Sequence, residues 1–237
     1  SLGLGRDPID DLSGLIEMLE VPVEFSPLLP EGHHGFTAWN RTHVGWSAVM
    51  LVNSHDLWTV QRYTQAHELG HVLFEDRPGD LTTEVTDKTA EKIASTSVEA
   101  RAEAFAGELL IPESGLLQYW KSIDALGLDR TRSIASVMWH FGVSRTAACI
   151  ALESAGAVPW SEADTTAVSQ VSVESLMHAA GLAEQWSQLQ SASVEWKPSP
   201  WLLEQTASLF DDSQLPVENY ATAASLEPQI ALEALLV

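Results

Sequence analysis

Apolar residues recur at helical spacing in some stretches of the chain and alternate with polar residues in others. Helical spacing with start and stop signals predicts helices over residues 7–20, 57–77 and 88–110. Alternating or continuous apolar runs predict strands over residues 21–25, 33–39 and 46–53. We therefore expect an α+β fold with a mainly helical core and a small antiparallel sheet.

The second half of the chain predicts only helices. A short helix follows Pro112, and residues 134–148 have the pattern helix, turn, helix. After Gly156 the composition changes, because eleven acidic residues follow with Lys197 as the only base. Helical spacing continues there over residues 176–189, 201–210 and 230–237. We expect three parts: an N-terminal core (1–122), a helix-turn-helix-like unit packed on it (123–156) and an acidic helical C-terminal region (157–237).

The charge of the chain limits its partners. The net charge is −21, from 33 acidic and 12 basic residues. Phosphate backbones are bound through Lys and Arg, and Arg145 is the only base between Gly142 and Gly156. We expect no direct contact with nucleic acid and a basic protein as partner, although the acids could equally serve solubility alone. A single cysteine, Cys149, and the lack of a membrane-spanning apolar run predict a cytoplasmic protein that does not contact the membrane.

The strongest chemical signal is the H-E-x-x-H motif at residues 67–71. On a helix, His67 and His71 project from one face with Cβ atoms about 5–6 Å apart, so one cation can bridge their imidazoles. Glu68 can then reach a water on that cation and act as general base. The neighbouring Val72 and Leu73 suggest a buried helix, and the mid-helix Gly70 predicts that another backbone packs closely there.

A catalytic zinc site needs a third protein ligand and an open position. The predicted helix at 88–110 offers Glu99 and Glu103 on one face, among alanines small enough to approach Gly70. Both carboxylates remain candidates on spacing alone. An oxyanion donor could come from Tyr63, Tyr119 or His140, although each of these residue types more often has a structural role. His33 and His34 lie in a Gly-rich turn, where exposed histidines without a catalytic part are more common.

Two motifs in this order resemble the ImmA/IrrE family of zinc metallopeptidase-like proteins. They are the segment Arg62–His71 after an apolar strand ending in Asn53, and the downstream E-x-x-A-x-x-F-A-x-x-L-L-x-P run from Glu99 to Pro112. The resemblance covers roughly residues 8–155. It implies a zincin-like metallopeptidase core within residues 1–122 and Glu99 as the third ligand of one zinc ion. Glu103 and Arg101 depart from the family pattern, so Glu103 is either a partner that orients a ligating histidine or a rival ligand.

The resemblance also implies what the protein does. We expect a zinc-dependent endopeptidase that cleaves a transcriptional repressor or another DNA-binding regulator, with Glu68 as general base. Such basic regulators would be attracted to an acidic enzyme. The alternative is a regulatory binding protein without catalysis, whose metal site is structural and whose acidic tail sequesters a basic partner.

Overall fold

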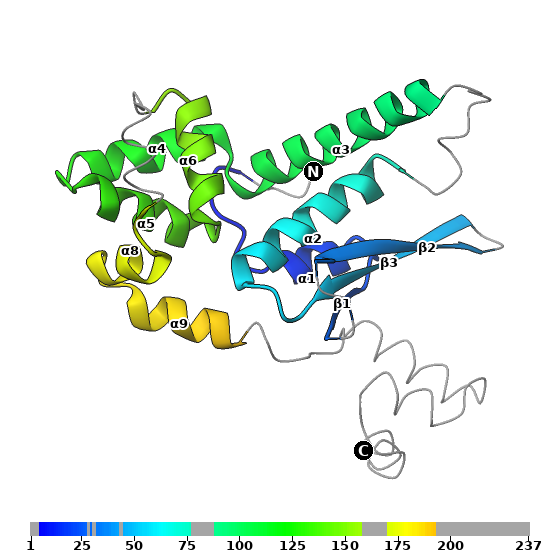
Figure 1. Ribbon diagram of the computed structural model, residues 1–237, viewed down its shortest axis with the longest axis horizontal. Helices are drawn as coiled ribbons and strands as arrows, with labels where there is room; N and C mark the ends of the chain where they lie inside the picture. The colour runs from blue at the N-terminus through cyan, green and yellow to red at the C-terminus, as the bar shows by residue number, and fades with distance from the viewer. Residues whose placement is uncertain are drawn as a thin grey trace, which may run out of the picture.

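The arrangement of the elements places one helix at the centre of the core. The computed structural model describes residues 5–27, 29, 32–42, 45–76, 88–157 and 170–192. Helix α2 (Trp58–Leu73) contacts strands β2 (Gly35–Thr42) and β3 (Gly45–Asn53) and helix α3 (Lys88–Leu110). Figure 1 shows α2 between the sheet and α3. The predicted mainly helical α+β fold is confirmed.

The sheet is mixed rather than antiparallel. Its strand order is β1-β3-β2, with β1 at Val23–Ser26. β2 and β3 form the expected antiparallel pair, in which Thr37 is opposite Met50. β1 runs parallel to β3, with Val23 also opposite Met50. The prediction of a purely antiparallel sheet was wrong because alternation reports which face a side chain takes and carries no information on strand direction.

Helix α1 is shorter than the predicted 7–20 and spans Leu12–Glu17. The Asp11 carboxylate accepts a hydrogen bond from the Gly14 amide at 2.9 Å, which caps the helix and fixes its start. At the other end Glu20 has a left-handed φ of 62°, so the helical path stops before it. The Asp-Pro pair at residues 7 and 8 therefore precedes the helix instead of opening it.

Helices α2 and α3 pack closely at Gly70, as predicted. A Cβ placed on Gly70 would lie 3.2 Å from the Ala102 Cα and 3.2 Å from the Phe105 ring. Glycine at this position lets the two helix backbones approach, which brings polar side chains of both helices within reach of each other. The bounds of α3 match the prediction, and α2 begins and ends within the predicted range.

The helix-turn-helix pattern is formed by α5 (Arg130–Phe141) and α6 (Arg145–Ser154), which follow α4 (Glu113–Asp124). Gly142 makes the turn with φ 64°, a conformation that favours glycine. Its carbonyl accepts a hydrogen bond from Arg62 Nε at 3.1 Å. The turn is thereby attached to α2. Arg145, the one base of α6, donates to the Val171 carbonyl.

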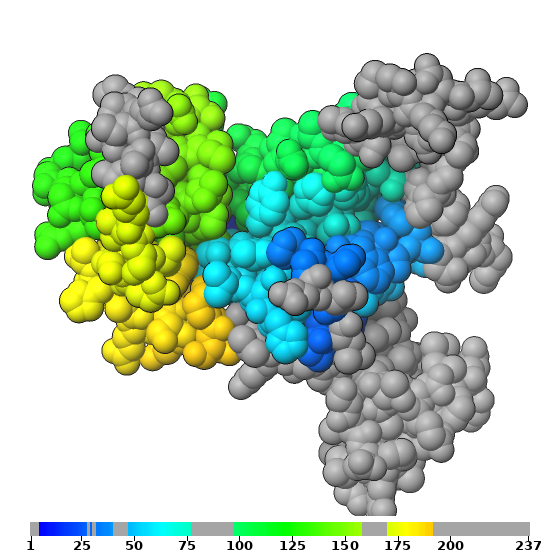
Figure 2. All heavy atoms as spheres, in the orientation of Figure 1, coloured from blue at the N-terminus to red at the C-terminus, as the bar shows by residue number. Residues whose placement is uncertain are grey.

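Two helices of the C-terminal region are described, α8 (Val173–Ala179) and α9 (Ala183–Ala192). The predicted run 176–189 is broken by Gly181, whose φ is 73°. Trp186 of α9 packs edge-on against Trp58 with ring centroids 6.0 Å apart. Figure 2 shows these yellow and orange helices beside the rest of the described surface. The predicted helices at 201–210 and 230–237 lie outside the described residues.

One apolar core joins these elements. Buried side chains from Leu12 to Trp186 form a single cluster, with Met50 and Val52 from the sheet and Phe141 from α5 fully enclosed. This core fixes α2 from several sides. None of the described helices combines the length and the apolar character that crossing a bilayer requires.

Candidate metal centre

Helix α2 places the two motif histidines side by side, as their spacing predicts. The Nε2 atoms of His67 and His71 lie 3.0 Å apart, and the side chains are 17% and 14% exposed. The buried face of this helix is less apolar than the sequence suggested. Leu73 is 49% exposed, whereas the buried face is largely polar and includes Thr59, Gln61, Arg62, Thr64 and Gln65.

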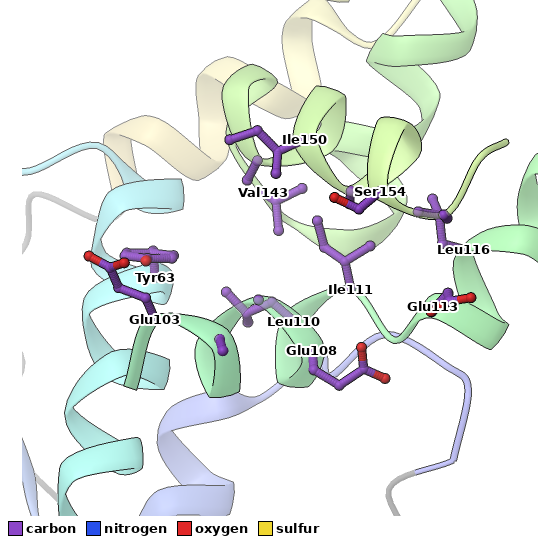
Figure 3. A pocket seen from close by; sticks show the side chains of 15 residues that line it. Tyr63, Glu103, Glu108, Leu110, Ile111, Glu113, Leu116, Val143, Ile150 and Ser154 are labelled. Atoms are coloured by element: carbon purple, nitrogen blue, oxygen red, sulfur yellow. The ribbon is translucent and has the colours of Figure 1, made fainter. Parts of the chain in front are cut away.

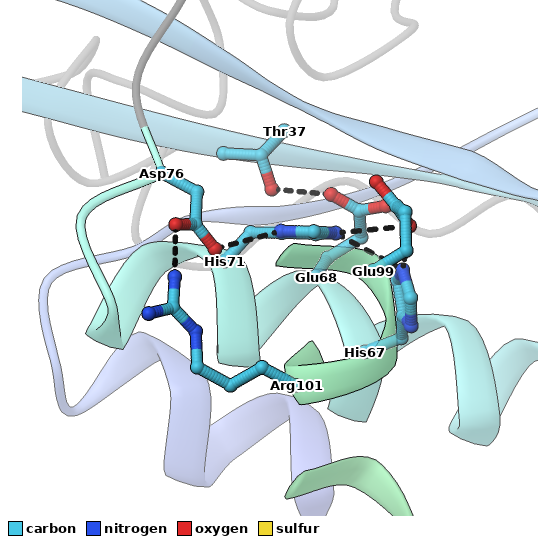
Figure 4. A network of polar contacts seen from close by, with 7 residues as sticks. All are labelled: Thr37, His67, Glu68, His71, Asp76, Glu99 and Arg101. Atoms are coloured by element: carbon cyan, nitrogen blue, oxygen red, sulfur yellow. Dashed lines mark hydrogen bonds and ion pairs between the residues drawn. The ribbon is translucent and has the colours of Figure 1, made fainter. Parts of the chain in front are cut away.

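Glu99 completes a group of three potential ligands. Its Oε2 lies 3.3 Å from His67 Nε2 and 3.6 Å from His71 Nε2, and its side chain is 54% exposed. A tetrahedral zinc ion with bonds of about 2.0–2.1 Å keeps its ligand atoms about 3.3 Å apart. The three atoms therefore already have the spacing of one face of such a site, and two imidazoles with one carboxylate are a donor set that suits zinc. Figure 4 shows them converging from α2 and α3.

Glu68 is held beside this group by the sheet. Thr37 Oγ1 on β2 donates a hydrogen bond to Glu68 Oε2 at 2.7 Å. Glu68 is not one of the three clustered ligand residues, so its carboxylate remains available for acid–base chemistry. Glu68 can be recognised from the motif, but Thr37 cannot be recognised from the sequence, because nothing in the alternation of the strand distinguishes this threonine from its neighbours.

Two further residues orient His71. Its Nδ1 lies 3.1 Å from Asp76 Oδ2, and Arg101 donates to the other oxygen of the same carboxylate. Because an ionised carboxylate only accepts, Nδ1 carries the proton and Nε2 presents its lone pair towards Glu99. A carboxylate on the second nitrogen is common for metal-binding histidines. Here the carboxylate comes from a residue just past the end of the motif helix.

The region that carries these residues matches a known family. Residues 16–153 match the model of the IrrE N-terminal-like domain, Peptidase M78, which is a family of metallopeptidases. The match covers more than half of the chain and contains both motifs. The chain belongs to this family. No curated protein matches the sequence.

Glu103, the second carboxylate that the spacing left open, takes a different position from Glu99. It lies one turn further along α3, outside the cluster of three, and lines a pocket together with Tyr63. Burial raises the pKa of the Tyr63 phenol, and the charge of Glu103 raises it further. The Tyr63 ring also stacks near His67, with centroids 6.2 Å apart. Tyr63 therefore lies next to the ligand group, and Asp76 has the orienting position considered for Glu103.

The other candidates lie elsewhere. Tyr119 on α4 stacks on His140 of α5, with ring centroids 3.8 Å apart, and its hydroxyl faces the Ser136 carbonyl at 3.4 Å. Burial lowers the pKa of His140, and the charges of Asp7 and Asp10 act in the opposite direction. Both rings belong to the packing between α4 and α5.

The histidines of the Gly-rich turn take no part in the cluster either. His34 is 60% exposed and its Nδ1 lies 2.9 Å from Asp56 Oδ2. The backbone carbonyl of His33 accepts from the Asn53 side chain, while its imidazole is exposed. Among the described residues, the geometry separates these surface histidines from the pair on α2.

Proposed function

We propose that this protein is a zinc-dependent endopeptidase and that its substrate is a basic DNA-binding regulator such as a transcriptional repressor. Membership of a metallopeptidase family supports hydrolysis of a peptide bond. The observation that carries the proposal is the convergence of His67, His71 and Glu99 within ligand distance, next to a glutamate that is not a ligand.

In this proposal His67, His71 and Glu99 hold the ion. When bound, zinc acidifies a water molecule and polarises a carbonyl oxygen. Glu68 takes the proton of the attacking water on Oε1, since Thr37 occupies Oε2, and later passes it to the leaving amine. Asp76 keeps the His71 ring in the orientation and tautomer that leave Nε2 for the ion.

We propose Tyr63 as the hydroxyl donor to the developing oxyanion, in preference to Tyr119 and His140. Its ring lies along the face of α2 that carries the two histidines, whereas the other two stack on each other between α4 and α5. A donor aimed at the developing charge contributes about 10²–10³ in turnover in other hydrolases. Tyr63→Phe should lower kcat while leaving the zinc content unchanged.

The proposed substrate follows from charge as well as from family. A net charge of −21 attracts basic proteins and repels nucleic acid directly. A regulator that binds DNA carries the Lys and Arg residues such attraction needs. A DNA-binding substrate and the single cysteine both favour the cytoplasm as the place of reaction.

Glu68→Gln tests the proposal. The purified variant should bind one zinc ion and unfold at the same denaturant concentration as the parent, since the amide can still accept from Thr37. Hydrolysis of a co-expressed regulator should fall by at least about a hundredfold, because the general base is lost. Glu153→Gln, an exposed carboxylate on α6, is the matched control and should cleave normally.

The same variant separates the alternative function. If Glu68→Gln relieves repression in cells as well as the parent does, then binding rather than cleavage produces the output. The protein would then be an acidic regulatory binding protein with a structural metal. Fragments of the regulator that appear only with the parent chain would exclude that reading.

A further inference from the structure

An apolar groove begins beside the metal centre and continues away from it. Its lining starts at Tyr63 and Glu103, each one helical turn from a clustered ligand residue, and ends along α6. The volume is about 360 Å³, within the range of about 300–1,000 Å³ that ligand pockets occupy. Figure 3 shows Tyr63 and Glu103 at one end and Ile150 of α6 on the far wall.

The walls of this groove are apolar and one rim is acidic. Leu110, Ile111 and Val143 line its interior, and Ile150 is 59% exposed although it is a large aliphatic residue. An aliphatic side chain left in water above an apolar pocket indicates a surface that a partner covers. The α3 and α4 side carries Glu103, Glu108 and Glu113, and no Lys or Arg is among the described residues that line the groove.

We propose that this groove binds the substrate next to the scissile bond and selects a segment with large apolar residues flanked by Lys or Arg. The apolar residues would fill the interior between α3 and α6, and the basic residues would face the three glutamates. The proposal rests on the proposed peptidase function, because the Tyr63 ring connects the groove to His67.

Charge favours a basic partner over a segment of the same chain. Residues 193–237 carry seven acidic residues and only Lys197 as a base. Such a segment would bring like charges to Glu103, Glu108 and Glu113. A second copy of the chain, with its net charge of −21, meets the same repulsion.

Gly107 offers a way to fill the groove without disturbing the fold. It lines the groove from the last turn of α3, and a Cβ added there would meet nothing within 4 Å. Gly107→Trp should therefore obstruct the groove, whereas Gly107→Ala adds only a methyl group and is the matched control. Glu108→Lys reverses one charge of the rim, and Asp124→Lys makes the same change on the exposed end of α4, outside the groove.

The probe is a short fluorescent peptide with Leu and Phe at its centre and Lys on both sides. Its binding is measured by anisotropy on the zinc-loaded Glu68→Gln chain, and its cleavage on the active chain. Gly107→Trp and Glu108→Lys in the protein should each weaken binding of the peptide by about tenfold. Replacing the central Leu and Phe of the peptide with Ser, or its flanking Lys residues with Glu, should weaken binding by a similar factor. Gly107→Ala and Asp124→Lys should bind within about twofold of the parent. Binding should also weaken with salt.

The outcomes separate the two proposals. Cleavage that is undiminished in Gly107→Trp overturns the groove and leaves the peptidase intact. Binding that depends on the groove without any cleavage retains the groove and argues against the peptidase. If the Lys-flanked peptide does not bind at all, the groove is not a peptide-binding site. If the parent chain forms dimers and Gly107→Trp dissociates them, the occupant of the groove is a second copy of the chain. If the peptide changes hydrogen exchange only in residues 193–237, the occupant that it displaces is that segment.

Discussion

Arg62 and His67 lie five residues apart on α2 in opposite surroundings. Arg62 is 5% exposed, and its guanidinium donates to the Ile9 carbonyl at 2.7 Å and to the Gly142 carbonyl at 3.1 Å. Its polar atoms are engaged by the backbone of two other segments. His67 instead faces His71 and the half-exposed Glu99, so that three potential ligand atoms are directed at one another.

The difference shows how one helix carries both stability and chemistry. A buried charge that donates to backbone carbonyls holds its neighbours in place, and removing it leaves those carbonyls unpaired. A cluster of ligand atoms that face one another contributes little to folding until an ion binds. Substitutions on the Arg62 side should therefore change the free energy of unfolding, and those on the His67 side should change metal binding.

The largest effect should come from His71→Ala, which removes one of three proposed ligands. The zinc content of the purified chain should fall from about one equivalent to almost none, because two remaining ligands hold zinc too weakly to survive purification. The denaturant midpoint of the metal-free chain should change little. His34→Ala, a histidine also paired with a carboxylate but on the surface, is the control. One equivalent of zinc in His71→Ala would mean that the ligands are assigned wrongly.

Arg62→Met tests the other side of the comparison. Two hydrogen bonds to backbone carbonyls are lost, and the free energy of unfolding should fall by about 3 kcal/mol. Urea titration followed by circular dichroism measures it. Arg132→Met is matched to it, because Arg132 is exposed and pairs with Asp129 on the surface, so the change there should stay within about 0.5 kcal/mol. Equal effects of the two variants would show that Arg62 does not anchor α2.

Asp76→Asn should have an intermediate effect, confined to the metal. The amide preserves the shape of the side chain but loses the charge that fixes the His71 tautomer and pairs with Arg101. Zinc affinity, measured by competition with a chelator, should fall by about 10–100-fold. Asp56→Asn alters an equivalent histidine contact at His34 and should leave the zinc affinity unchanged. An unaltered zinc affinity in Asp76→Asn would show that Asp76 does not support metal binding through His71.

The sequence predicted most securely the features that depend on neighbours along one helix. The spacing of His67 and His71 put their imidazoles on one face, and Gly70 predicted the close approach of α3 that brings Glu99 to them. These are local consequences of helix geometry and of the missing Cβ. Spacing alone did not separate Glu99 from Glu103, because both positions share a helix face.

Contacts made by residues outside the two motif helices were not predicted. Thr37 reaches Glu68 only because β2 lies beside α2, and that placement depends on the whole sheet. The direction of β1 was missed for a related reason, since alternation is the same in parallel and antiparallel strands. Asp76 follows the end of α2, where the path of the backbone rather than any spacing rule returns the carboxylate to His71.

The smallest effect concerns His140, a histidine that serves packing rather than metal binding. Burial against Tyr119 lowers its pKa below the ordinary value of 6.5, despite Asp7 and Asp10. Unfolded chains therefore bind the proton more readily than folded ones, and the stability present above about pH 6.5 is lost as the pH falls through the folded pKa. His140→Phe keeps the stacking and removes the titration. Urea midpoints taken between about pH 7.5 and 5.5 should decline less in this variant than in the parent. If the two declines coincide, His140 is protonated equally well in both states, and its stacking on Tyr119 does not disfavour the charge.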